Sequence, residues 1–141
     1  QAGVQVRDTT RLSAGTLLLQ KQVRNIGPDG LQGTADDVDS SDGTANQAAP
    51  GDVLRYRLVF SNQGVRALTE VTVNDSTPAF SALNAAAACP AALPADLSGC
   101  SLSAPDGSNG PGYEGALQWL FSGQLLPGNQ GVVSYDVRVS P

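Results

Sequence analysis

The sequence contains no histidine, a single lysine, Lys21, and only two glutamates, Glu70 and Glu114, among its 141 residues. Histidine is the most frequent general base near neutral pH, and no serine–lysine pair at helical spacing replaces it. A catalytic pair of carboxylates cannot be assigned from the sequence. We therefore expect a protein that is not an enzyme and has no small-molecule substrate.

Clusters of positive charge and long hydrophobic runs are also missing. The eight Lys and Arg residues are dispersed and outnumbered by 13 Asp and Glu, which gives a formal net charge of −5. Contact with phosphates needs clustered Lys and Arg, so we expect no nucleic-acid partner. No run approaches the roughly 18 apolar residues that a membrane-spanning helix needs, so we expect no membrane insertion.

Cysteine is rare as well, and Cys89 and Cys100 lie in one segment rich in proline and alanine. With no histidine and no third thiol, they cannot form an ordinary zinc site. A disulfide that closes a short loop is the favoured interpretation, and two free buried thiols are the alternative. The chain begins at Gln1, as a secreted chain does after its leader is removed. We therefore expect a secreted protein, located outside the cell or at its surface.

Helical periodicity is scarce, whereas alternating apolar and polar residues between turns recur along the chain. In residues 53–60, the clearest strand, one face carries Leu54, Tyr56, Leu58 and Phe60, and the other, solvated face carries Val53, Arg55, Arg57 and Val59. Further strands are predicted over residues 16–23, 68–74, 117–122 and 131–139. Turn-bounded strands without helices between them predict an antiparallel β-sandwich.

Two long segments, residues 26–49 and the cysteine segment with its sequel 106–112, interrupt this rhythm and are expected to be loop insertions. The first is acidic, and calcium binds about six to eight oxygen ligands from flexible loops. The absence of a glutamate at the twelfth position excludes an EF-hand. The alternative is a solvated acidic cluster that binds no metal. The candidate calcium ligands are Asp29, Asp36, Asp37, Asp39 and Asp42.

Residues 49–78 contain a series of motifs in a defined order: Pro50-Gly51-Asp52, Tyr56, Asn62 with Gly64, Val71-Thr-Val73-Asn-Asp75, and Pro78. This order resembles the conserved repeat domain of unknown function number eleven, which bacterial and archaeal surface proteins carry, often in tandem. The resemblance covers roughly residues 16–140, with the two long segments as insertions. It implies an immunoglobulin-like β-sandwich at a cell surface and no catalytic activity. Asn62 and Gly64 are expected to adopt left-handed backbone conformations in a hairpin turn.

Residues 1–15 precede the resemblance and form an extension to the sandwich domain of residues 16–141. Val4, Val6 and Leu12 mark this extension as a candidate donor strand, because an appended strand can add to the sheet of a neighbour. Repeated head to tail, such pairing of the chain with itself makes an open filament. The alternative is that the extension pairs within its own sandwich as an additional edge strand.

Two functions follow. The first is a structural subunit of an extracellular or cell-surface filament, a pilus-like fibre or sheath, which assembles by N-terminal strand donation. The second is an adhesin or spacer module of a larger cell-wall protein. Lys21 could form an isopeptide bond to an Asn or Asp on a neighbouring strand, and the alternative is an ordinary exposed lysine.

Overall fold

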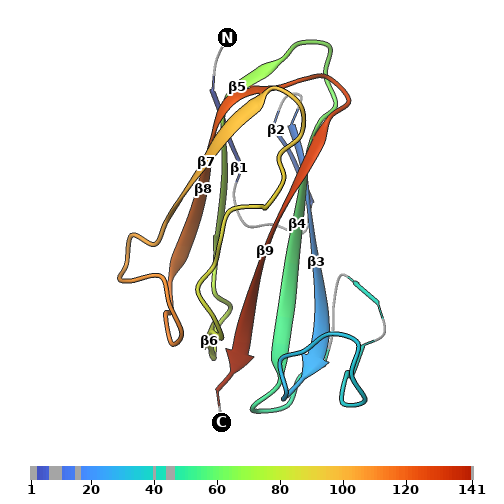
Figure 1. Ribbon diagram of the computed structural model, residues 1–141, viewed down its shortest axis with the longest axis vertical. Helices are drawn as coiled ribbons and strands as arrows, with labels where there is room; N and C mark the ends of the chain where they lie inside the picture. Colours follow the sequence, from blue (N-terminus) through green and yellow to red (C-terminus); the bar gives the residue numbers. More distant parts are fainter. Residues whose placement is uncertain (1–2, 7–10, 15–16, 40, 44–46, 141) are drawn as a thin grey trace.

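The computed structural model describes residues 3–6, 11–14, 17–39, 41–43 and 47–140. Within these residues the chain forms nine β-strands and no helix, which confirms the predicted all-β class (Figure 1). In the same residues no helix is long and apolar enough to cross a membrane. The strands are β1 (Gly3–Val6), β2 (Arg11–Ala14), β3 (Leu17–Gly27), β4 (Val53–Asn62), β5 (Leu68–Ser76), β6 (Ser81–Leu83), β7 (Leu97–Ser103), β8 (Ala116–Leu125) and β9 (Gln130–Val139).

The strands form two sheets that pack face to face as a β-sandwich. The first sheet has the order β1-β5-β8-β7 and the second has the order β2-β3-β4-β9-β6. All pairs of strands are antiparallel except one, because β1 runs parallel to β5. The two-layer sandwich predicted from the alternating patterns is therefore confirmed.

The core lies between the sheets and is built from the alternating residues of the long strands. In β9, Val133, Tyr135 and Val137 are buried, and they pair across the sheet with Leu58, Tyr56 and Leu54 of β4. The Phe60 ring of one sheet lies 4.8 Å from the Phe121 ring of the other, centroid to centroid. A Cβ atom at Gly131 would overlap the ring of Phe60, so this position in β9 requires glycine.

The predicted faces of β4 are correct with one exception. Leu54, Leu58 and Phe60 are buried as expected. Arg55, on the other face, forms a bidentate ion pair with Asp136 of β9. Val53, expected on the solvated face, is fully buried. Val53 pairs with Gly27, at the point where the register of β3 shifts. Its burial therefore depends on how the loop after β3 begins. The alternation of residues within β4 alone does not reveal this.

The strand boundaries differ from the predictions where the sequence has weak strand preference. β6 was not predicted, and β7 begins within the cysteine segment that was expected to be a loop, yet β7 pairs with β8 over Leu97–Ser103. Its Ser- and Gly-rich sequence has low β-propensity, and the neighbouring strand supplies the pairing that holds it. The first long strand begins at Leu17, and the predicted start at Thr16 lies outside the described residues.

Cys89 and Cys100 form a disulfide, which confirms the favoured pairing. Cys100 lies in β7, so the bond ties the alanine-rich segment after β6 to the edge strand of the first sheet. Trp119 of β8 donates a hydrogen bond of 3.1 Å from Nε1 to the carbonyl of Ala88 in that segment. The disulfide and this buried donor therefore both hold the segment against the sandwich.

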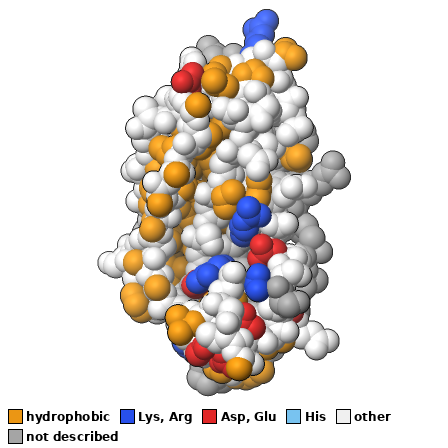
Figure 2. All heavy atoms as spheres, turned by 45° about the vertical axis from the view of Figure 1, so that its right-hand side comes forward, with side chains coloured by type: hydrophobic (Ala, Val, Ile, Leu, Met, Phe, Trp, Pro, Cys, Tyr) orange, Lys and Arg blue, Asp and Glu red, His pale blue; other side chains and the backbone are white. Residues whose placement is uncertain are grey.

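The molecule is elongated, and its two poles differ (Figure 1). The Gly3 end of β1 lies toward one pole, and β9 ends toward the other, beside the loop that connects β3 to β4. On the face shown in Figure 2, Lys, Arg, Asp and Glu side chains gather mainly in the half that contains this loop. On this face, charge is thus concentrated toward the pole opposite the start of β1.

Candidate functional site

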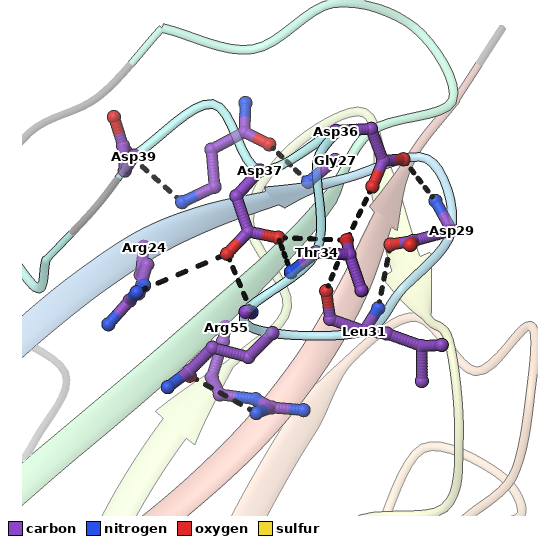
Figure 3. A network of polar contacts seen from close by, with 12 residues as sticks. Arg24, Gly27, Asp29, Leu31, Thr34, Asp36, Asp37, Asp39 and Arg55 are labelled. Carbon is purple, nitrogen blue, oxygen red and sulfur yellow. Dashed lines mark hydrogen bonds and ion pairs between the residues drawn. The ribbon is translucent and has the colours of Figure 1, made fainter.

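The acidic loop between β3 and β4 brings three of the five candidate metal ligands together (Figure 3). One carboxylate oxygen each from Asp29, Asp36 and Asp37 can be chosen so that all three lie within 4.8 Å of one another. Asp36 and Asp37 are half-buried, and Asp29 is exposed. Such oxygen atoms are the ligands that calcium prefers.

Hydrogen bonds from the loop itself position these carboxylates. Asp36 accepts from the backbone N–H of Asp29 at 3.0 Å and from the Thr34 hydroxyl at 2.7 Å. Asp37 accepts from the backbone N–H groups of Gly33 at 2.8 Å and Thr34 at 3.3 Å. Hydrogen bonds from neutral donors stabilise a carboxylate without adding a counter-charge, so the loop can fold around its own acidic side chains.

These contacts lower the pKa of both carboxyl groups below the ordinary value of 3.8. For Asp36 the main cause is the hydrogen bond from the Thr34 hydroxyl. For Asp37 it is the N–H of Gly33, with a smaller contribution from the nearby charge of Arg24. The Arg24 guanidinium lies 4.0 Å from Asp37 and already neutralises part of the charge that a bound cation would meet.

Asn25, which the sequence analysis did not single out, anchors the base of this loop. Its fully buried side chain donates from Nδ2 to the Gln47 carbonyl at 2.8 Å and to Asp52 at 2.9 Å. Its Oδ1 accepts from the N–H of Gly27 at 2.9 Å. Gly27 has a φ of 79°, and a Cβ there would overlap the backbone of Asp36. The Asn-x-Gly sequence was the available signal, because it combines a side chain that bonds backbone with a residue suited to positive φ.

The two remaining candidate ligands lie outside the group of three. Asp39 turns back to the strand, where its Oδ2 accepts a 2.8 Å hydrogen bond from the N–H of Asn25. Asp42 is exposed and lies two residues after Ser40, which is outside the described part of the chain. Asp39 therefore lies apart from Asp36 and Asp37, although it is close to them in sequence. In contrast, the N–H of Asp29 bonds to the carboxylate of Asp36, seven residues later. Calcium binding at the group of three stays a hypothesis.

A second polar cluster lies between the two sheets, around Lys21. The residue occupies the inward row of β3, between buried Leu19 and Val23. Its Nζ lies 3.0 Å from Oδ1 of Asp75 in β5, and the two side chains are 15% and 0% exposed. The expectation of an ordinary exposed lysine is therefore wrong, because strand alternation directs this side chain toward the core.

Two tyrosines contact this ion pair. The Tyr135 hydroxyl donates to Asp75 Oδ2 at 2.7 Å, and the Lys21 Nζ lies 4.8 Å from the centre of the Tyr56 ring. The two tyrosine rings are stacked with centroids 5.3 Å apart. We call Lys21, Tyr56, Asp75 and Tyr135 the inter-sheet cluster, since it joins β3, β4 and β9 of one sheet to β5 of the other.

Asn62 has a structural role that differs from the one expected. Neither Asn62 nor Gly64 has a positive φ, so the prediction of left-handed conformations is wrong. Instead, the fully buried Asn62 side chain donates to the carbonyls of Arg66 at 2.7 Å and Leu125 at 2.9 Å. It also accepts from the N–H of Gly64 at 2.9 Å. One side chain therefore ties the β4–β5 turn to the end of β8.

The candidate donor residues are paired with core positions of both sheets. Val4 and Val6 of β1 stand opposite Val71 and Val73 of β5, each of which is fully buried. Leu12 of β2 stands opposite Leu19 of β3, which is also fully buried. Within the single chain, this is the intramolecular pairing that the sequence left open as an alternative.

No protein-family model matches this chain, and neither the curated proteins nor the solved structures that were searched contain a match.

Proposed function

We propose that the protein is a structural subunit of an extracellular or cell-surface filament, in which the N-terminal strands of one copy complete the sandwich of the next. The observation that carries this proposal is the division of the N-terminal segment between the two sheets. β1 is the edge strand beside β5 in one sheet, and β2 is the edge strand beside β3 in the other.

The segment is suited to exchange because both of its strands are short and peripheral. β1 and β2 contain four residues each, and each has only one neighbour within the described sheets. If this segment left its own sandwich, β5 and β3 would become open edges, and open edges pair readily with other strands. Residues 3–14 of a second copy could form the same backbone pairings, as in domain swapping.

The position of the strands gives such an exchange a direction. β1 begins toward one pole of the elongated molecule, and β9 ends toward the other (Figure 1). A surface that donates strands and a different surface that accepts them make a heterologous contact, which generates an open chain unless the rotation closes a ring. A filament that propagates along the long axis of the sandwich is the simplest product.

Several properties support a structural role outside the cell. The disulfide between Cys89 and Cys100 is compatible with an oxidising compartment. The absence of histidine from the sequence removes the usual acid–base group of enzymes. The motif resemblance to surface-protein repeats and its immunoglobulin-like assignment point the same way, and both belong to this proposal.

A spacer or adhesin module in a larger surface protein is the second candidate. It is favoured by the pairing of β1 and β2 within their own chain, which leaves the domain complete without a partner. The opposite placement of the start of β1 and the end of β9 would also suit tandem domains joined end to end (Figure 1).

The two functions differ in what removal of residues 1–15 does. For a filament subunit, negative-stain electron microscopy of the purified full chain at increasing concentration should show fibres, and the shortened chain should form none. A synthetic peptide of residues 1–15 should bind the shortened chain, while a scrambled peptide of the same composition should not. A full chain that remains monomeric throughout in sedimentation experiments would favour the spacer and end the filament proposal.

A further inference from the structure

The inter-sheet cluster contains the only lysine of the sequence, and that lysine points into the sandwich rather than toward solvent. Its Nζ and the Asp75 Oδ1 are 3.0 Å apart, and the Asp75 side chain has no exposed surface. Removing two opposite charges from water costs free energy that their attraction alone need not recover. A lysine and an aspartate held together in this way are also the two components of an amide bond.

We propose that Lys21 and Asp75 become joined by an intramolecular isopeptide bond. The bond would connect β3 of one sheet to β5 of the other, residues that are 54 positions apart in sequence. This inference does not depend on filament assembly, because every group that it requires lies within one chain. It adds a second covalent link to a domain in which the disulfide joins residues only 11 positions apart.

The reaction is a condensation that needs no oxidant and no cofactor. A proton passes from the ammonium group of Lys21 to the carboxylate of Asp75, which gives an amine and a carboxylic acid. Burial makes this transfer less costly than in water, because both charged forms are penalised there. The neutral Nζ then attacks Cγ of Asp75, and the nitrogen–carbon bond forms as one carbon–oxygen bond breaks. One water leaves, so that the ammonium and carboxylate groups together become one amide and one water.

Tyr135 is placed to assist the departure of that water. Its hydroxyl donates to Asp75 Oδ2, at 2.7 Å, whereas Lys21 contacts the other oxygen, Oδ1. Tyr135 can pass its proton to Oδ2 as that oxygen leaves, and it regains a proton from the attacking nitrogen. The stacked ring of Tyr56 lies against both Tyr135 and Lys21, and this contact holds the amine beside the carboxyl group. Preorganised donors and short distances of this kind are what a condensation between side chains needs.

Mass spectrometry of the intact, denatured full chain tests the proposal directly. The expected mass is that of the sequence minus the two hydrogens of the disulfide and minus one water. Trypsin should release residues 12–24, uncleaved at Lys21, joined to residues 67–138. Because Lys21 is the only lysine, an amine-reactive label applied under denaturing conditions should fail to modify a side chain in the cross-linked protein.

Two variants locate the bond. Lys21→Arg retains the positive charge but cannot form the amide, so its mass should include the water that the original chain has lost. Asp75→Asn should either regain the full mass or lose ammonia in place of water. An ammonia loss identifies residue 75 as the partner when the cross-linked peptide contains Lys21 and that residue. Tyr135→Phe should lower the cross-linked fraction of freshly refolded protein.

The original chain decides the question even if a variant fails to fold. A mass that lacks only the two disulfide hydrogens, together with full labelling of Lys21, would overturn the proposal. If the only further loss maps to another position, such as ammonia from cyclisation of Gln1, the proposal is overturned equally. A cross-linked peptide that contains Lys21 and Asp75 would establish it.

Discussion

The hydroxyl of Tyr135 and the buried carboxylate of Asp75 meet across the centre of the sandwich at 2.7 Å. Tyr135 belongs to β9 and Asp75 to β5, so this hydrogen bond links the two sheets at a point where most contacts are apolar. Polar groups placed in a core require partners with defined geometry, and they therefore fix how the two layers are aligned.

Removal of this hydroxyl should destabilise the fold without changing its architecture. In protein without the proposed Lys21–Asp75 bond, where Asp75 keeps both oxygens, Tyr135→Phe keeps the ring that stacks on Tyr56 but leaves Asp75 Oδ2 without this donor. We expect a loss of about 1–3 kcal/mol in the free energy of unfolding, measured by urea denaturation. Ser101→Ala, at an exposed position of β7, serves as the control and should change stability by less than about 0.5 kcal/mol. Equal stability of the two variants would contradict the assigned role.

Asn62 should be one of the most sensitive polar positions. Asn62→Ala removes two donated hydrogen bonds and one accepted bond from a fully buried site. The expected loss is about 2–4 kcal/mol, since the substitution removes all three hydrogen bonds, one of them the buried bond to the Leu125 carbonyl. Asn62→Asp, which retains only the acceptor, should be similarly unstable. The exposed neighbour substitution Gln63→Ala should have little effect, and a comparable loss there would show that the turn is merely sensitive to substitution.

As the pH falls, the acidic loop should lose its carboxylate hydrogen bonds before the sandwich unfolds. The pKa values of Asp36 and Asp37 are lowered below 3.8, so the folded loop favours their ionised forms. This contribution is complete above the ordinary value and is lost as the pH falls through the lowered values. Amide exchange of Gly33 and Asp29 should therefore accelerate below about pH 4, relative to amides of β9. In Asp37→Asn the Gly33 amide should lose most of this pH dependence. Exchange at Gly33 that is unchanged by acid would contradict the assigned hydrogen bonds.

Calcium should bind weakly if the three clustered carboxylates form a site. Isothermal titration calorimetry of the full chain should give a Kd of about 10⁻⁴–10⁻³ M, the range of extracellular calcium modules. Asp36→Asn should abolish the signal because Asp36 belongs to the group of three. Asp42→Asn removes the same charge from outside that group and should leave binding intact. No heat at millimolar calcium, or equal effects of both substitutions, would contradict the calcium site. The acidic loop would then be stabilised by its own hydrogen bonds alone.

The core could be predicted from sequence because alternation within a strand assigns each residue to one face. This reasoning succeeded for Leu58 and Phe60 and for Val133 and Val137, all of which are buried. It failed for Val53, whose burial depends on a neighbouring loop rather than on its own strand. It also missed β7, because a strand rich in serine and glycine forms only when a partner is present.

The polar sites were harder to predict, since their partners are distant in sequence. Nothing near Lys21 indicates Asp75, which lies 54 residues away on the other sheet. In the acidic loop, the spacing of the aspartates did not reveal that Asp39 bonds to Asn25 while Asp29 approaches Asp36. Strand patterns specify which way a side chain points, but the sheet order decides what it meets.

Disulfide trapping of the N-terminal strand tests the central claim, that β1 is exchanged between copies. Gln5 of β1 is paired with Thr72 of β5, so the double variant Gln5→Cys/Thr72→Cys places two thiols at facing positions. After mild oxidation of assembled protein, a non-reducing denaturing gel should show a ladder of linked oligomers, whereas Gln5→Cys alone should give nothing larger than dimers. Cross-linked monomers alone, recovered from assembled protein, would show that β1 stays in its own sandwich and would contradict the account.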